Sequence, residues 1–298
     1  MTRAEATGGW RDDHRVIELL DEADLLHVAV TTRRGVHVTP AVFEREGRRL
    51  WFVTPRRSVK AKAIRRHRLV GGLVQVGDRA LMFNGRARVV DPLTGRGISL
   101  GRVFDLPFAG LGYLGRNHKH AVGTVRDHKA PTLPLSRVIV SIDVARIALL
   151  EGHRVAATWG RWERLDLVIH GSPPEACPPD LESVPPSVRR LVSNGDAAVV
   201  LGWQSTSGPL ALPGRWRLDT GLVETSGAAM VLAGAGSASA ACITAERSGH
   251  RLKTKRGLLL AGLGRARRDG ETAHVAIDQE RITWWEGEAS RTVAGAPS

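Results

Sequence analysis

The sequence predicts a mainly β protein built from two tandem copies of one barrel-type domain. The pattern V-x-I-D-x-x-R-I-x-x-x-E-G occurs at Val140–Gly152 and again, 135 residues later, at Val275–Gly287. A glycine followed five residues later by a proline also recurs, at Gly35–Pro40 and Gly208–Pro213. This period is too long for a solenoid, whose repeats run about 20–50 residues. We therefore expect two similar domains, with a functional site between them.

The first copy reads as a short helix followed by β-strands. Val16, Leu19 and Leu20 fall on one helical face, and the segments after them alternate with period two and are rich in β-branched residues. Ser58 is a suitable N-cap for a second helix. The order β-β-β-α-β-β favours an antiparallel barrel over a βαβ fold. The expected helices are His14–Ala23 and Ser58–His67, and the expected strands are Leu26–Thr32, His37–Phe43, Leu50–Thr54, Leu69–Val76 and Ala80–Val90.

The second copy repeats this plan more faintly. An uncharged segment, Ala228–Gly236, takes the place of the basic second helix of the first copy. The proline-rich stretch Gly171–Pro179 favours an extended linker. We place the first domain at residues 14–165, the linker at 166–180 and the second domain at 181–290, with an insert of roughly 91–135 in the first copy. The elements expected in the second copy are a helix at Pro185–Val192 and strands at Ala197–Trp203, Leu210–Leu212, Ala240–Thr244, Leu258–Leu260 and Ala273–Ile277.

Composition narrows the choice of partner and compartment. The net charge of +13 suits an anionic partner, but the arginines are scattered, aromatic residues make up only 5%, and no nucleic-acid-binding motif is present. No apolar run is long enough for a transmembrane helix, and no signal peptide is recognisable. Cys177 and Cys242 are the only cysteines, without a CxxC pattern, which suits a reducing compartment and argues against a structural zinc site. We expect a cytoplasmic protein that binds neither membrane nor nucleic acid.

Three segments stand out in the first copy: Leu26–Pro40, Leu50–Val70 and Asn84–Val90. They resemble the pyridoxamine 5′-phosphate oxidase-like, FMN-binding split-barrel family. The resemblance extends over residues 16–90 and reaches the second copy only through the internal repeat. It implies a flavin-dependent oxidoreductase that acts on a small organic substrate with FMN, or alternatively the deazaflavin coenzyme, and a reduced nicotinamide as a candidate partner. Because split barrels of this family usually work as dimers, the two copies are expected to pack as an internal pseudo-dimer, and the chain to be monomeric or a homodimer.

The resemblance places the flavin phosphate at the strand end and helix start formed by Thr54, Ser58, Lys60 and Lys62. The chemistry supports this independently, because a loop that enters a helix offers free N–H groups and the positive end of the helix dipole, here with lysines in the first turn. A solvated basic helix face is the alternative interpretation. By analogy, Thr54 and the backbone of Val38 and Thr39 would contact the flavin ring.

The second copy lacks the basic pair, so we expect one cofactor per chain, bound to the first copy and covered by the second. No catalytic residue is predicted, because the flavin carries the redox chemistry and the protein orients it. The candidate covering residues are Trp203, Trp216, Lys253, Lys255 and Arg256.

Two other functional classes stay open. The first is a haem- or tetrapyrrole-binding protein, for which His27 or His37 could be an axial ligand, as could His118, His120 or His128 of the insert. The second is a non-enzymatic basic module that binds nucleic acid or an acidic protein. A metal site at the insert histidines is not predicted, because Asp127 is the only acidic residue near them.

Overall fold

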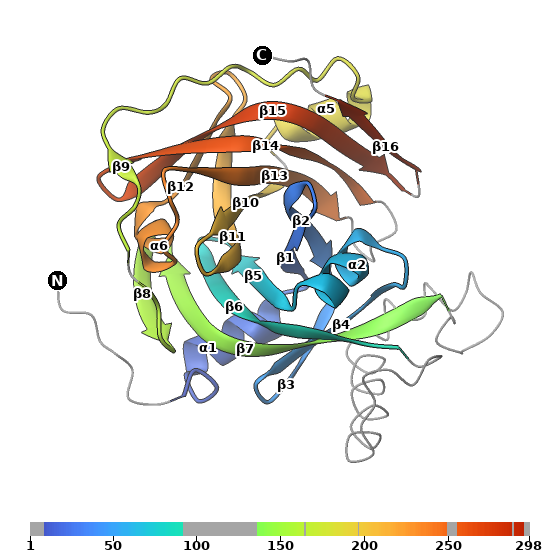
Figure 1. Ribbon diagram of the computed structural model, residues 1–298, viewed down its shortest axis with the longest axis vertical. Coiled ribbons are helices and arrows are strands. Elements are labelled where there is room, and N and C mark those ends of the chain that lie inside the picture. Colours follow the sequence, from blue (N-terminus) through green and yellow to red (C-terminus); the bar gives the residue numbers. More distant parts are fainter. Residues whose placement is uncertain are drawn as a thin grey trace.

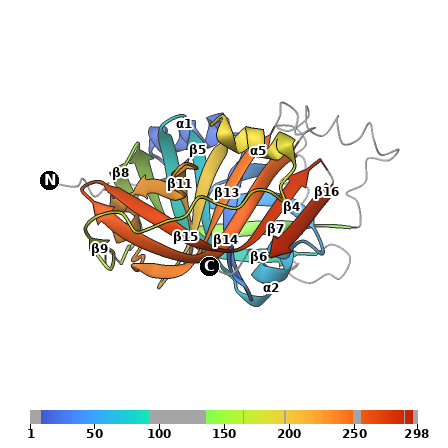
Figure 2. The ribbon, with the colours of Figure 1, turned by 90° about the horizontal axis from the view of Figure 1, so that it is seen from above.

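The computed structural model describes residues 9–91, 136–163, 165–195, 197–248, 255–287 and 289–294 of the chain. Within them, most regular structure is β, in two eight-stranded sheets that each come from one half of the sequence (Figures 1 and 2). The predicted fold class is confirmed: the chain forms two packed barrels. The predicted insert at 91–135 lies outside the described residues apart from Asp91.

The first sheet runs in the order β2-β1-β5-β6-β7-β4-β3, and β8 pairs with β7. Its interior is apolar, with Phe52, Phe83 and Leu81 among the fully buried side chains, and helices α1 and α2 add Leu19 and Ile64 to the same core. Asp13 caps α1 and Ser58 caps α2, as the sequence predicts for Ser58. The elements are α1 His14–Glu22, β1 Leu26–Thr32, β2 Gly35–Ala41, β3 Phe43–Glu46, β4 Arg49–Pro55, α2 Val59–Arg66, β5 Leu69–Val76, β6 Arg79–Val90, β7 Arg137–Glu151 and β8 Arg154–Trp159.

The second sheet closes on itself, because β15 pairs with both β12 and β14 in the ring β15-β12-β11-β10-β13-β14. Strands β9 and β16 extend this sheet beyond the ring. Ser226 caps α6 as Ser58 caps α2. The elements are β9 Ile169–His170, α5 Pro186–Ser193, β10 Ala198–Ser205, β11 Gly208–Arg217, β12 Leu222–Ser226, α6 Gly227–Leu232, β13 Ala238–Ser248, β14 Lys255–Asp269, β15 Thr272–Glu286 and β16 Ala289–Ala294.

The two sheets share local details that the duplication explains. The repeated pattern forms most of the long strands β7 and β15. The pairing of β6 with β7 shifts register between Asn84 and Gly85, and that of β14 with β15 shifts at the equivalent Ala261 and Gly262. A bulge kept at the same position strengthens the local twist in both barrels.

The strands predicted after the first helix of the first copy differ from the structure in one place. The expected strand His37–Phe43 is two strands, because the pairing of β2 ends at Ala41 and that of β3 begins at Phe43. In the second barrel one unbroken strand, β11, pairs with both β10 and β12. The strands predicted in the second copy are present but are longer than expected, since β14 and β15 each contain 15 residues.

The barrels meet along two seams related by the duplication. At the first seam β2 packs against β10, β13 and β14, and at the second seam β11 packs against β1, β5 and β6. Helix α2 lies near the first seam and α6 on the opposite side of the molecule, near the second (Figure 1). Backbones approach closely here: a Cβ on Gly71 would collide with the Pro209 carbonyl oxygen, and one on Gly202 would meet Val38 Cγ2 and Cys242 Sγ, each at 2.6 Å. Glycine is therefore required at Gly71 and Gly202.

Candidate functional site

The predicted phosphate segment lies where β4 leads into α2. Thr54, which is buried, and Ser58 share a hydroxyl–hydroxyl hydrogen bond of 3.0 Å. Ser58 Oγ also accepts a bond of 3.1 Å from the backbone N–H of Ala61, which fixes the first turn of the helix. The structure thus brings Thr54 and Ser58 together at the positive end of the α2 dipole.

The two lysines of the segment have different environments. Lys60 is only 9% exposed, and its ammonium donates a 2.6 Å hydrogen bond to the carbonyl oxygen of Pro40 in β2 and lies 5.5 Å from the centre of the Phe52 ring. Lys62 is exposed. Residues two apart on a helix do not share a face, so the structure does not bring the lysines together. Lys60, which is tied to β2, is the better placed of the two to meet a group at the first seam.

The second barrel contributes a cation to the same place. Arg281 of β15 donates a 3.2 Å hydrogen bond to the carbonyl oxygen of Arg34 in the turn before β2. The pKa of His37 is lowered to about 4, mostly by burial and to a smaller extent by the nearby charges of Lys60 and Arg281. His37 is therefore neutral at pH 7, between cations from both barrels. Arg281 was not predicted, although it is the arginine of the repeated pattern.

The Val38 carbonyl and the Thr39 hydroxyl of β2 differ in whether they already have a hydrogen-bond partner among the described residues. The Val38 side chain is fully buried, and its carbonyl oxygen already accepts a 2.9 Å hydrogen bond from the Thr244 hydroxyl of the second barrel. The Thr39 hydroxyl is buried and has no hydrogen-bond partner among the described residues. A buried polar atom without a partner is costly, so the Thr39 hydroxyl suits a bound polar group.

Of the predicted covering residues, the three whose side chains the structure describes have partners within the second barrel. Trp203 is fully buried in the core of the second barrel, and Trp216 packs at the edge of that core. Arg256 pairs with Glu286 at 3.0 Å. Lys253 lies outside the described residues, as does the side chain of Lys255.

His27 forms a buried polar contact across the first seam. Its Nε2 lies 3.0 Å from Glu246 Oε1 of β13, and the two side chains are 7% and 3% exposed. The pair ties β1 to the second barrel and occupies the Nε2 atom that an axial haem ligand would need. Of the other predicted haem ligands, His37 lies within β2, and His118, His120 and His128 lie outside the described residues.

The second seam holds the counterpart of Arg281, which is Arg146 of β7. Its guanidinium lies 4.8 Å from the centre of the Trp162 ring and donates to Asn84 Oδ1 at 3.3 Å. Burial lowers the pKa of Arg146. Helix α6 has no charged residue, and Ala228 and Met230 stand where α2 has Lys60 and Lys62. At the second seam, therefore, the Trp162 ring covers Arg146, and the neighbouring helix α6 carries no positive charge.

The described part of the chain contains no cluster of three or more His, Cys, Asp or Glu residues suited to a metal ion. Within the same residues, no helix combines the length and apolar character needed to span a bilayer.

Comparisons with known proteins find similarity at the level of three-dimensional structure. No protein-family model matches the chain, and no curated protein matches its sequence. An FMN-binding, pyridoxamine 5′-phosphate oxidase-related protein from Nostoc punctiforme is 15% identical, with a TM-score of 0.38, over 49% of this chain and 85% of its own. A FAD-binding protein from Mesorhizobium loti is 14% identical, with a TM-score of 0.34, over 45% and 89%. An F420 reductase is 22% identical, with a TM-score of 0.31, over 44% and 94%.

Each of these structures resembles about half of this chain. At such identities and TM-scores, only this chain's own residues bear on its function.

Proposed function

We propose that this protein is a flavin-dependent oxidoreductase that binds one cofactor per chain at the first seam. FMN is the first candidate, the deazaflavin coenzyme is the alternative, and the substrate is a small organic molecule, with a reduced nicotinamide as a candidate partner. The observation that carries the proposal is the set of anion-binding groups that both barrels supply at one place. Thr54, Ser58 and Lys60 come from the first barrel, and Arg281 comes from the second.

The donors fit a phosphate-bearing cofactor. Lys60 and Arg281 supply positive charge, the start of α2 supplies a helix dipole, and Thr54 and Ser58 supply hydroxyl groups. The buried Thr39 hydroxyl, which lacks a partner among the described residues, would gain one from a polar edge of the ring. A neutral His37 can donate one hydrogen bond without adding a proton to the cofactor.

When bound, a flavin or deazaflavin supplies the redox chemistry, and the protein supplies binding, orientation and shielding from water. In this chain Lys60 and Arg281 would hold the anionic tail. The β2 strand between them would set the position of the ring, because Lys60 and Thr244 both bond to its carbonyl groups.

The alternatives receive less support from the side chains. Haem binding by His27 would break its buried contact with Glu246, which is costly unless another group replaces it. A purely non-enzymatic basic module would give no reason for Lys60 to be buried, since a solvated lysine serves a surface contact equally well.

Absorbance spectra can test the proposal directly. The purified protein is mixed separately with FMN, deazaflavin coenzyme and haemin, and unbound ligand is removed before each spectrum. The wild type should retain a flavin or deazaflavin band and no haem band. Lys60→Met should lose the band, whereas Lys62→Met should keep it, because Lys62 is exposed and points to another face of the helix.

Native mass spectrometry adds the stoichiometry, and one cofactor per chain is expected. A band that survives in Lys60→Met while that variant melts like the wild type would overturn the proposed site. Retention of haem alone would favour the tetrapyrrole class, and retention of no chromophore, with steeply salt-dependent DNA binding, would favour the basic module.

A further inference from the structure

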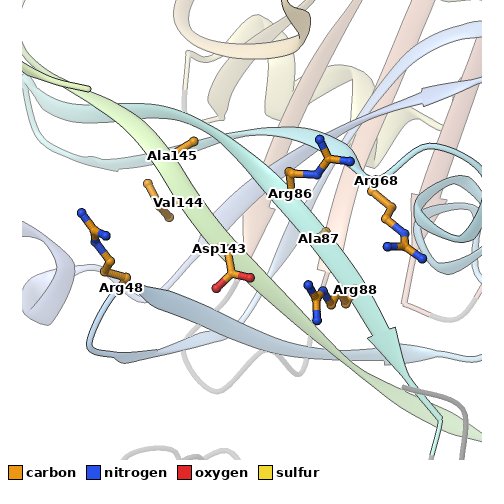
Figure 3. Close-up of a pocket in the computed structure, with 8 residues that line it drawn as sticks. All are labelled: Arg48, Arg68, Arg86, Ala87, Arg88, Asp143, Val144 and Ala145. Atoms are coloured by element: carbon orange, nitrogen blue, oxygen red, sulfur yellow. The ribbon is translucent and has the colours of Figure 1, made fainter. Parts of the chain in front are cut away.

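A second cationic site lies on the first barrel, at the bulge between β6 and β7. It is a pocket of about 350 Å³. Figure 3 shows Arg86 and Arg88 on β6, Asp143 on β7, Arg48 from the β3–β4 turn, and Arg68 from the segment between α2 and β5. Three separate stretches of chain therefore bring guanidinium groups to one concave surface. Ala87, Val144 and Ala145 complete the lining.

Backbone hydrogen bonds hold the two loop arginines in place. The carbonyl oxygen of Arg68 accepts from the N–H of Ala87 at 2.7 Å, and that of Arg48 accepts from the N–H of Val144 at 3.3 Å. Arg86 and Arg88 are fixed by the β6 ladder. The pocket is thus built on a rigid sheet and anchored loops, which limits the entropy lost when a ligand binds.

Within the described part of the chain, no acidic side chain neutralises the four arginines. All four are exposed, and none forms an ion pair with another described residue. Asp143, the one acidic residue of the lining, is paired with Arg49 through an Nε–Oδ1 contact of 2.9 Å. Gathering like charges costs free energy through mutual repulsion, so the fold alone gives no reason for this cluster.

The second barrel provides an internal comparison. At the equivalent bulge Leu263 replaces Arg86, and Arg265, the equivalent of Arg88, pairs with Asp278 at 2.9 Å. The turn before β12, residues 218–221, contains no arginine. The same framework therefore forms without the cluster, which is specific to the first barrel.

We propose that this pocket binds a small molecule that carries two or more linked phosphate groups. Guanidinium groups match phosphate oxygens in bidentate geometry and stay charged at any physiological pH. A volume of about 350 Å³ is at the lower end for small-molecule sites. Linked phosphates place several negative charges within that space, whereas a nucleic-acid duplex needs an extended basic stripe. The site is separate from the proposed cofactor site and does not depend on it.

Calorimetric titration with inorganic tripolyphosphate at fixed salt tests the pocket. The double variant Arg86→Gln/Arg88→Gln should weaken the affinity at least tenfold. The matched control Arg189→Gln/Arg291→Gln removes the same charge from exposed positions of the second half and should bind like the wild type. Pyrophosphate should bind more weakly than tripolyphosphate, and orthophosphate more weakly still.

Three results would overturn the proposal. Equal losses in the two double variants would show that net charge alone attracts the anion. Tighter binding of citrate than of tripolyphosphate would point to a carboxylate ligand, and tighter binding of a DNA duplex, lost in Arg86→Gln/Arg88→Gln, would make the surface a nucleic-acid contact. The flavin band should persist in this variant, and its loss would assign the arginines to the cofactor site.

Discussion

The two seams of this molecule descend from one duplicated framework and differ in what lies in them. At the first seam Lys60 and Arg281 surround a neutral His37. At the second, Trp162 covers Arg146, and α6 has no charge. The shared parts, the bulge and the arginine of the repeated pattern, belong to the packing of the sheet, whereas the charged groups around them have diverged. Joining two barrels in one chain lets each seam change independently, which a symmetric homodimer does not allow.

The largest expected effect comes from forcing the barrels apart at a shared backbone contact. Gly71→Leu should lower the free energy of unfolding by about 3 kcal/mol, because its side chain would collide with the backbone at Pro209. Urea denaturation measures this. Gly236→Ala is the control, since its new Cβ would meet only Ala238 O, at 3.8 Å. If both variants were equally stable, the close contact between Gly71 and the Pro209 backbone at the second seam would be contradicted.

A smaller loss is expected when the polar contact of the first seam is cut. Glu246→Ala leaves His27 buried without its partner and should destabilise the protein by about 2 kcal/mol. A double-mutant cycle with His27→Ala should give a coupling energy between the two side chains. Additive effects of the two substitutions would mean that the pair does not hold the barrels together.

Much of the fold was predictable because its signals are local. The V-x-I-D pattern, the period-two strands and the Ser58 cap all depend on residues near each other in the sequence, and each corresponds to a structural feature. The break between β2 and β3 was not predictable, since Val42 and Phe43 are good strand residues and only the closure of the barrel separates the two pairings.

The candidate site was predictable only on the side formed by contiguous sequence. Thr54, Ser58 and Lys60 are close in the chain, but Arg281 reaches Arg34 across 247 positions. Charge alone also pointed to Lys62 and Arg256, because sequence does not reveal that Lys62 is solvated or that Arg256 is paired with Glu286. In the sequence, the one sign of Arg281 was that it repeats Arg146 of the first copy. Only the structure shows that the two arginines lie at different seams with different neighbours.

These equivalent arginines allow a direct comparison of cofactor binding at the two seams. Arg281→Met should weaken cofactor affinity about tenfold, the loss of roughly 1.5 kcal/mol expected for a charge-assisted hydrogen bond. Arg146→Met should leave affinity unchanged, because that arginine lies at the other seam under Trp162. Fluorescence titration with FMN or the deazaflavin coenzyme measures both. Equal losses in the two variants would contradict binding at the first seam alone.

The smallest expected effect is a pH dependence of stability that arises from His37. Its pKa is about 4 in the folded protein, against about 6.5 in an unfolded chain, so between these values the unfolded state binds the proton and the folded state does not. Stability from this residue is therefore complete above pH 6.5 and is lost as the pH falls toward 4. The loss should stay within about 1 kcal/mol, since the side chain is partly exposed and its charge is screened by solvent. Urea denaturation across this range should show a flatter profile for His37→Asn than for the wild type, while His14→Gln, an exposed control, keeps the wild-type slope. An unchanged slope in His37→Asn would mean that neither burial nor the charges of Lys60 and Arg281 lower the pKa of this imidazole, and the description of the first seam would then need revision.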